Sequence, residues 1–181
     1  KGFGGVASGP APLRQLLEDV RTLLNKRLGQ MLTSADITDI ANMTGRCVIA
    51  GNVRRSAEIA LGSPDDLDFS RLKDATYFPE RNDPSNGWSW VSNNSLLFEV
   101  ESQDYDYGPA AELTWAHGEP GFVWVFNARN YGRMNGVVDR SDSEVLGLNP
   151  CAEIVLEHRE FCVTGETRIQ TRTGLFKIAD V

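Results

Sequence analysis

The sequence predicts an α/β fold, in which crossover connections join the strands of a sheet. Three observations support this prediction. Helix-like and strand-like segments alternate along the chain, which is typical of sheets covered by helices. Residues 12–28 repeat leucine and valine at about the 3.6-residue period of a helix. The apolar run Phe122–Phe126 has the length and composition of a strand buried on both faces.

Two helices are expected before the first strand. The first spans residues 12–28, with Pro12 in its first turn and a leucine-rich face that should pack into the core. The second spans about 35–49, with Ser34 as its N-cap. Cys47 shares the helical spacing of the apolar residues in this segment, so we expect a core residue rather than a redox partner.

The segment 51–56 contains glycine, asparagine and two arginines and should end the second helix. A strand over Ala57–Leu61 is expected to follow it. A short helix over about 65–74 and a polar loop over 76–88 come next. Residues Ser89–Val100 are rich in aromatic and β-branched side chains, which predicts another strand.

Asn93 and Asn94 lie inside this predicted strand, where two asparagines are unusual for packing alone. Two interpretations stay open. The amides could hold neighbouring loops through hydrogen bonds, or they could contact a substrate.

The following segment, Pro109–His117, is expected to form a helix that Gly118 ends. Residues 127–144 show little periodicity, so a long loop and a short helix are both consistent with them. His117 and His158 stand outside any metal-ligand pattern, and we expect both at the surface.

Composition narrows the class of protein. The chain has 181 residues and a net charge of −7, which argues against a general nucleic-acid surface. No apolar run is long enough to span a membrane, and no signal peptide is apparent. The three cysteines contain no CxxC pair, so a disulfide scaffold or zinc site is not expected. These features favour a reducing, cytoplasmic setting. Because the chain begins with Lys1, we interpret it as an internal part of a longer protein.

The most informative stretch is Asn149-Pro150-Cys151-Ala152-Glu153. If it is extended, the side chains of Asn149, Cys151 and Glu153 point the same way. An amide, a thiol and a carboxylate would then meet in one small volume, which is an arrangement for chemistry rather than packing. The alternative is a buried free cysteine at the end of a strand.

This motif resembles the active-site loop of ribonucleotide reductases, and most closely that of the adenosylcobalamin-dependent class II enzymes of the triphosphate type. Other stretches resemble the same family in the same order: GGVASGP (4–10), GNVRRSAEIALG (51–62), SNNSL (92–96) and GEPGF (118–122). The resemblance covers roughly residues 1–162. It implies part of a ten-stranded ribonucleotide reductase α/β barrel, with the cysteine loop inside.

The resemblance also implies roles for individual residues. Cys151 would become a thiyl radical, Glu153 would act on the ribose 3′ hydroxyl as a general base, and Asn149 would hold the substrate. Cys162 stands at the family's position for a second redox cysteine. Two loops would sense the effector and the substrate base, through residues Gly4, Gly5, Ser8 and Gly9 in the first and Asn52, Arg54 and Arg55 in the second.

The implied cofactor is adenosylcobalamin, with its site and the first redox cysteine outside this chain. The implied partners are a ribonucleoside triphosphate or diphosphate substrate, a deoxynucleotide or ATP effector, and thioredoxin or a similar reductant. No nucleic acid, membrane or metal ion is implied. The choice between triphosphate and diphosphate substrates and the oligomeric state stay open. The resemblance favours the monomeric triphosphate enzyme.

After Phe161 the sequence changes character. Residues 162–181, CVTGETRIQTRTGLFKIADV, resemble the first block of an intein, in which the opening cysteine is the nucleophile and a β-hairpin follows. We therefore expect a reductase barrel segment over 1–161 and the start of an intein (Hint) domain over 162–181. Three alternatives remain: a class I large subunit, a chain whose relevant chemistry is protein splicing, and an inactive α/β domain with a chance motif.

Overall fold

The computed structural model describes residues 7–51, 56–101, 104–131, 138, 140, 142–158, 168–171 and 174–177. Within these ranges the fold is mixed α/β with a parallel sheet, as the sequence predicts. The ten-stranded barrel stays a prediction.

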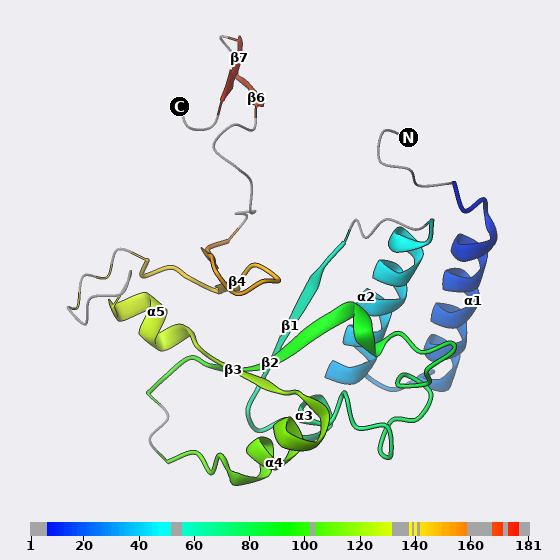
Figure 1. The fold of residues 1–181 in the computed structure, drawn as a ribbon, viewed down its shortest axis with the longest axis horizontal. Helices are drawn as coiled ribbons and strands as arrows, with labels where there is room; N and C mark the ends of the chain where they lie inside the picture. Colours follow the sequence, from blue (N-terminus) through cyan, green and yellow to red (C-terminus); the bar gives the residue numbers. More distant parts are fainter. Residues whose placement is uncertain are drawn as a thin grey trace.

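The main sheet of the described part contains β1 (Glu58–Gly62), β2 (Ser92–Phe98) and β3 (Gly121–Trp124), in that order. Both pairings are parallel, with Ile59 opposite Asn93 and Ser95 opposite Gly121. Helical segments lie between successive strands in the sequence, as parallel pairing requires. Strand β2 is therefore the central strand of this sheet (Figure 1).

Two long helices lie side by side next to the sheet, α1 (Ala11–Lys26) and α2 (Ser34–Ile49), and α2 contacts β1 (Figure 1). The predicted core-packing face of α1 is only partly confirmed. Leu23 is buried, but several apolar side chains of this region are exposed: Leu13, Leu17, Leu24 and Leu28. Among the described helices and strands α1 packs mainly against α2, and it also reaches the loop 76–88 through the Lys26–Glu80 ion pair (3.2 Å).

The N-cap of α2 is Thr33, so the prediction of Ser34 was wrong by one residue. The Thr33 hydroxyl accepts a hydrogen bond from the Asp36 backbone N–H (3.2 Å). The Asp36 carboxylate accepts in return from the Thr33 N–H (2.8 Å). This reciprocal capping box decides which of two adjacent hydroxyls caps the helix, because only Thr33 has a carboxylate three residues later. Cys47 lies on α2 and is half-buried.

The shorter helices refine the predicted boundaries. Helix α3 (Leu67–Ser70) is shorter than predicted. Helix α4 (Gly108–His117) ends as expected at Gly118, whose positive φ of 81° suits glycine. The predicted strand 122–126 was too long, because β3 ends at Trp124 and α5 (Val125–Tyr131) begins at the next residue. A 3-10 turn, η1 (Ser89–Val91), occupies the first residues of the segment predicted as a strand.

The hydrophobic core lies between α2, α3, α4 and the sheet, and its buried members are Ala35, Phe69, Leu72, Leu96, Phe98 and Ala110. Around Phe98 four more aromatic rings gather: Tyr105, Tyr107, Phe122 and Trp124. This packing fixes the ends of β2 and β3 and so the position of the sheet.

Two small antiparallel pairs complete the described structure. Strands β4 (Gly147–Leu148) and β5 (Val155–Leu156) pair on either side of the cysteine motif. Strands β6 (Arg168–Thr171) and β7 (Gly174–Lys177) pair within the segment that resembles an intein. The model contains no helix, in the ranges it describes, with the length and apolar character of a membrane span.

Candidate active site

The cysteine motif forms a tight turn between β4 and β5, so the extended run on which the expected side-chain alternation depended is not present. The Ala152 N–H donates to the Asn149 carbonyl (2.8 Å), and the Asn149 N–H donates to the Ile154 carbonyl (3.0 Å). Ala152 has a φ of 61°, in the left-handed region that non-glycine residues seldom occupy. Because backbone hydrogen bonds close the chain into a turn, its side chains do not alternate as they would along an extended strand.

The Asn149 side chain organises this turn from inside. It is 3% exposed, and its Oδ1 accepts hydrogen bonds from the backbone N–H groups of Glu153 (3.1 Å) and Ile154 (3.0 Å). The asparagine side chain thus accepts hydrogen bonds from backbone N–H groups that could otherwise pair with backbone carbonyls. Cys151 and Glu153 are exposed instead. The structure therefore presents the thiol and the carboxylate outward, and it separates the amide from them.

The turn is connected to the main sheet through β2. Asn93 Nδ2 donates a hydrogen bond to the Pro150 carbonyl (3.1 Å). Asn94 makes its own hydrogen bonds with Ser92 and Glu119. Of the two interpretations of this asparagine pair, the structure shows hydrogen bonds that hold neighbouring segments.

A cavity of about 610 Å³ borders the turn, between α2 and β1. Leu148 and Pro150 line it on the side of the turn, and Asn42 and Ser34 line it on the side of α2. In the described structure, the Asn42 amide and the Ser34 hydroxyl are buried without a hydrogen-bond partner.

A partly buried ion pair fixes the beginning of β2. Lys73 Nζ donates to the carbonyls of Ser92 (2.8 Å) and Ser89, and it lies 3.6 Å from Glu119 Oε2. The same Glu119 oxygen accepts from the backbone N–H (3.0 Å) and Nδ2 (2.8 Å) of Asn94. Burial raises the pKa of the Glu119 carboxyl, and the charge of Lys73 and the hydrogen bonds oppose that shift. Burial also lowers the pKa of the Lys73 ammonium.

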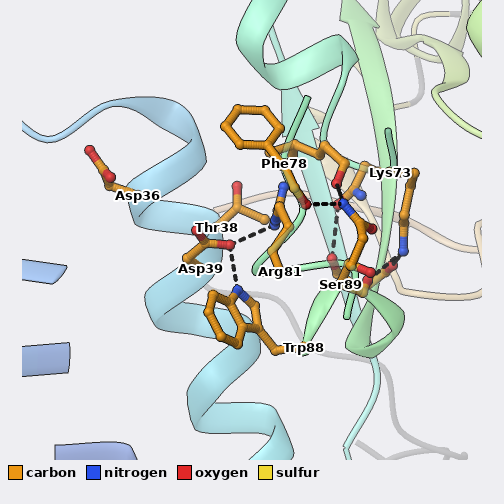
Figure 2. A network of polar contacts seen from close by, with 12 residues as sticks. Asp36, Thr38, Asp39, Lys73, Phe78, Arg81, Trp88 and Ser89 are labelled. Atoms are coloured by element: carbon orange, nitrogen blue, oxygen red, sulfur yellow. Dashed lines mark hydrogen bonds and ion pairs between the residues drawn. The ribbon is translucent and has the colours of Figure 1, made fainter. Parts of the chain in front are cut away.

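A second polar network joins the loop 76–88 to α2. Figure 2 shows Asp39 between Arg81 and Trp88, with a dashed line to each. Asp39 Oδ1 lies 2.7 Å from Arg81 Nη2, and it accepts a hydrogen bond from Trp88 Nε1 (2.6 Å). The Arg81 carbonyl accepts from the backbone N–H groups of Trp88 and Ser89. Ser89 begins η1, which leads directly into β2, so this network also holds the segment just before β2 in place.

The predicted nucleotide-sensing loops fall largely outside the described residues. Ser8 and Gly9 are described; both are exposed, and Gly9 has a φ of 70° just before α1. The other predicted loop residues and Cys162 lie outside the described ranges: Gly4, Gly5, Asn52, Arg54, Arg55 and Cys162.

Sequence reasoning assigned no role to Lys73, Glu119, Arg81, Asp39 or Trp88. Glu119 lies in the GEPGF stretch that carried the resemblance, which was a usable signal. Lys73 and Arg81 had no such signal in the sequence. A lysine or arginine in a polar segment is usually solvent-exposed, and its burial becomes evident only when its distant partner is known.

Several known proteins that share one enzyme name are similar in sequence to this chain. The chain is 45% identical over 162 residues to an adenosylcobalamin-dependent ribonucleoside-triphosphate reductase of Lactobacillus helveticus, a match of 89% of this chain and 21% of the relative. It is 44% identical over 167 residues to the enzyme of that name from Euglena gracilis, at 92% of this chain and 22% of the relative. A probable enzyme of this type from Dictyostelium discoideum is 40% identical over 168 residues, at 92% and 21%.

No family model matches the chain, and no solved structure is a significant match. The chain spans about a fifth of the length of the curated relatives it matches. Over about nine-tenths of its own length, it is therefore similar to one part of several adenosylcobalamin-dependent ribonucleoside-triphosphate reductases.

Proposed function

We propose that this chain is the thiol-bearing part of an adenosylcobalamin-dependent ribonucleoside-triphosphate reductase. The observation that carries the proposal is the exposed Cys151 thiol on a turn whose backbone is fixed by Asn149, with the exposed Glu153 carboxylate two residues later. The identity of 40% to 45% with relatives of that name supports it. Their names favour the cobalamin-dependent enzyme over the class I alternative.

The proposed reaction replaces the ribose 2′ hydroxyl with hydrogen. Cys151 in its thiyl form takes the hydrogen atom from the ribose C3′, and Glu153 accepts the proton of the 3′ hydroxyl as a general base. The 2′ hydroxyl leaves as water, and Cys151 returns the hydrogen atom to C3′. A dithiol supplies the two electrons and becomes a disulfide. The sum is a ribonucleotide and a dithiol converted to a 2′-deoxyribonucleotide, a disulfide and water.

When bound, adenosylcobalamin supplies the radical chemistry that removes the hydrogen atom from the thiol. The exposed Cys151 fits this requirement, because the abstracting group must approach the sulfur directly. We expect the residues that hold the cofactor to lie outside this chain. A dithiol protein such as thioredoxin fits as the reductant, and a deoxynucleotide or ATP fits as the effector.

Asn149 is proposed to act first on the shape of the turn. Its Oδ1 is engaged by the backbone of the turn, so its first role is to shape the loop that carries Cys151. A contact between Asn149 and the substrate stays a prediction. The same holds for the base-sensing roles of Arg54 and Arg55, which would alter effector-dependent substrate preference without changing the radical step.

A direct test uses the complete protein that contains this chain. It is incubated with each ribonucleoside triphosphate, adenosylcobalamin and a dithiol, and the 2′-deoxy product is quantified by chromatography. We expect product only when the cofactor is present, without any added radical-generating subunit. Parallel reactions with diphosphates decide the substrate level. A folded protein that forms no deoxynucleotide from either substrate would contradict the proposal.

A second function is proposed for residues 162–181, as the beginning of an intein. One observation favours it: the antiparallel pair β6–β7 lies in this segment, where a β-hairpin is expected at the start of an intein. In the proposed first step, the Cys162 thiol attacks the Phe161 carbonyl. A thioester forms as the peptide C–N bond breaks, and the amide nitrogen gains the proton.

The intein proposal makes a prediction about the complete precursor. Cys162→Ala should block ligation and leave an unspliced protein, which intact mass measurement detects, whereas the control Cys47→Ala should splice normally. Splicing would remove Cys162, so we expect the first residue after the intein to be a cysteine that restores the reductase thiol. A mature protein that retains Val163–Thr167 would contradict this.

A further inference from the structure

We propose that Asn93 is a positioning residue, which holds the Cys151 turn against the central strand through the Pro150 carbonyl. This inference rests on the proposed function, because positioning matters only if Cys151 reacts. Asn93 Nδ2 lies 3.1 Å from the Pro150 oxygen, across 57 positions of sequence. The Pro150 carbonyl and the Cys151 nitrogen belong to one planar peptide unit. Movement of the carbonyl therefore moves the backbone of Cys151.

The internal hydrogen bonds of the turn set its shape but not its place. Asn149 bonds to Glu153 and Ile154 through its side chain, and Ala152 bonds back to Asn149, all within six consecutive residues. Such bonds are unchanged if the turn moves as a unit. The place of the turn relative to β2 depends on a contact from outside it, and the Asn93 amide provides one.

Asn93, the hydrogen-bond donor, lies on a strand that several other contacts hold in place. Asn93 lies on β2, opposite Ile59 of β1, and its neighbour Asn94 points to the other face. Asn94 is 2% exposed, and both its backbone N–H and its amide donate to Glu119. Lys73 in turn bonds to the Ser92 carbonyl on the same strand. A reactive group is placed most reproducibly when its support is anchored in this way.

The Asn93 side chain is exposed, so it adds little to the hydrophobic core. Its amide therefore differs from that of Asn94, whose buried contacts hold the strand itself. If the role of Asn93 is to place the thiol, its loss should lower kcat and leave the fold and KM nearly unchanged. A displacement of about 1 Å at a reacting group can lower the rate about 100-fold.

The test compares Asn93→Asp and Asn93→Ala with wild type in the complete protein. Aspartate keeps the shape of the side chain but removes the Nδ2 donor. Asn25→Asp is the matched control, because it makes the same change of charge at an exposed position of α1. Two measurements are made. Steady-state kinetics give kcat and KM for a ribonucleoside triphosphate with adenosylcobalamin and a dithiol. Peptide mass spectrometry gives the rate at which iodoacetamide alkylates Cys151 without cofactor.

We expect kcat of both Asn93 variants to fall by about 10- to 100-fold, with KM within about twofold of wild type. We also expect iodoacetamide to alkylate Cys151 faster in both variants, because the turn is less restrained. Asn25→Asp should match wild type in both measurements. If Asn93→Asp does not fold by circular dichroism, Asn93→Ala carries the comparison. Wild-type kcat and alkylation in a folded Asn93 variant, beside an inactive Cys151→Ser, would overturn the positioning role alone. Full turnover by Cys151→Ser would instead overturn the proposed function.

Discussion

Arg81 Nη2 lies 2.7 Å from Asp39 Oδ1 inside the protein and joins the loop 76–88 to α2. The Arg81 side chain is 2% exposed, and its guanidinium also lies over the ring of Phe78 (Figure 2). Burial raises the pKa of Asp39, and the charge of Arg81 opposes that shift. The two charges thus depend on each other, because either one alone would be buried without compensation.

We therefore predict that Arg81→Met destabilises the fold. Methionine fills much of the same space but leaves the Asp39 carboxylate without its cation, which costs about 3–5 kcal/mol for a buried pair. Urea unfolding followed by tryptophan fluorescence measures the change. The control is Arg71→Met, at an exposed arginine that packs on Tyr77; its effect should stay within about 0.5 kcal/mol. Equal effects of the two substitutions would refute the structural role of the Arg81–Asp39 pair.

The capping box of α2 predicts an asymmetry between two adjacent hydroxyls. Thr33→Ala removes the side chain that accepts the Asp36 N–H and should lower stability by about 1 kcal/mol. Ser34→Ala should cost much less, because the Ser34 hydroxyl is buried without a hydrogen-bond partner in the described structure. Urea unfolding and hydrogen exchange of the first turn of α2 compare the two variants. If Ser34→Ala proved the more harmful, Ser34 would be the true N-cap.

The shifted carboxyl at Glu119 predicts a pH dependence of stability. Burial raises its pKa in the folded protein above the ordinary value of 4.5, so the folded state binds this proton more tightly than the unfolded state does. The stability from this group is present below pH 4.5 and is lost as pH rises through the raised folded pKa.

Glu119→Gln isolates that contribution. The free energy of unfolding of wild type minus that of the variant should fall as pH rises from about 4.5 towards neutrality. Urea unfolding at a series of pH values measures this difference, and Glu112→Gln on the exposed side of α4 serves as the control. A difference that instead increases with pH would mean that Lys73 outweighs burial and lowers the Glu119 pKa.

Sequence patterns predicted the elements well where the deciding interactions are local. Apolar periodicity placed α1 and α2, and Gly118 marked the end of α4. The cap of α2 required choosing between Thr33 and Ser34, and the capping-box spacing to Asp36 would have decided it. The end of β3 at Trp124 had no comparable signal, because Val125 and Phe126 suit a buried strand as well as a helix.

The sequence indicated a candidate site but not its geometry. The motif identified Cys151 and Glu153, yet alternation along an extended strand misplaced Asn149. The Asn149 side chain competes for the backbone of its own turn, and that competition depends on β4–β5 pairing around it. The support given by Lys73 and Asn93 joins residues far apart in sequence, so no local pattern indicates it.

Glu153 is predicted to act on the rate rather than on binding. Glu153→Gln keeps the size and the backbone N–H that bonds to Asn149 Oδ1, so the turn should keep its shape. Loss of the general base should lower kcat about 10²- to 10⁴-fold while KM changes little. Steady-state kinetics of the complete protein measure both, with Glu157→Gln as a control beyond the motif. A large rise in KM at unchanged kcat would show that Glu153 only binds substrate.

We propose that the Cys151 sulfur is the hydrogen-atom carrier of the reaction. Cys151→Ser differs from wild type by one atom, and the hydroxyl O–H bond is too strong to replace the thiol as a hydrogen-atom carrier. The direct measurement is deoxynucleotide formation by the complete protein with adenosylcobalamin and a dithiol, with Cys47→Ser on α2 as the matched control. We predict no product above background from Cys151→Ser and wild-type turnover from Cys47→Ser. Sustained deoxynucleotide formation by folded Cys151→Ser would contradict the assignment of Cys151.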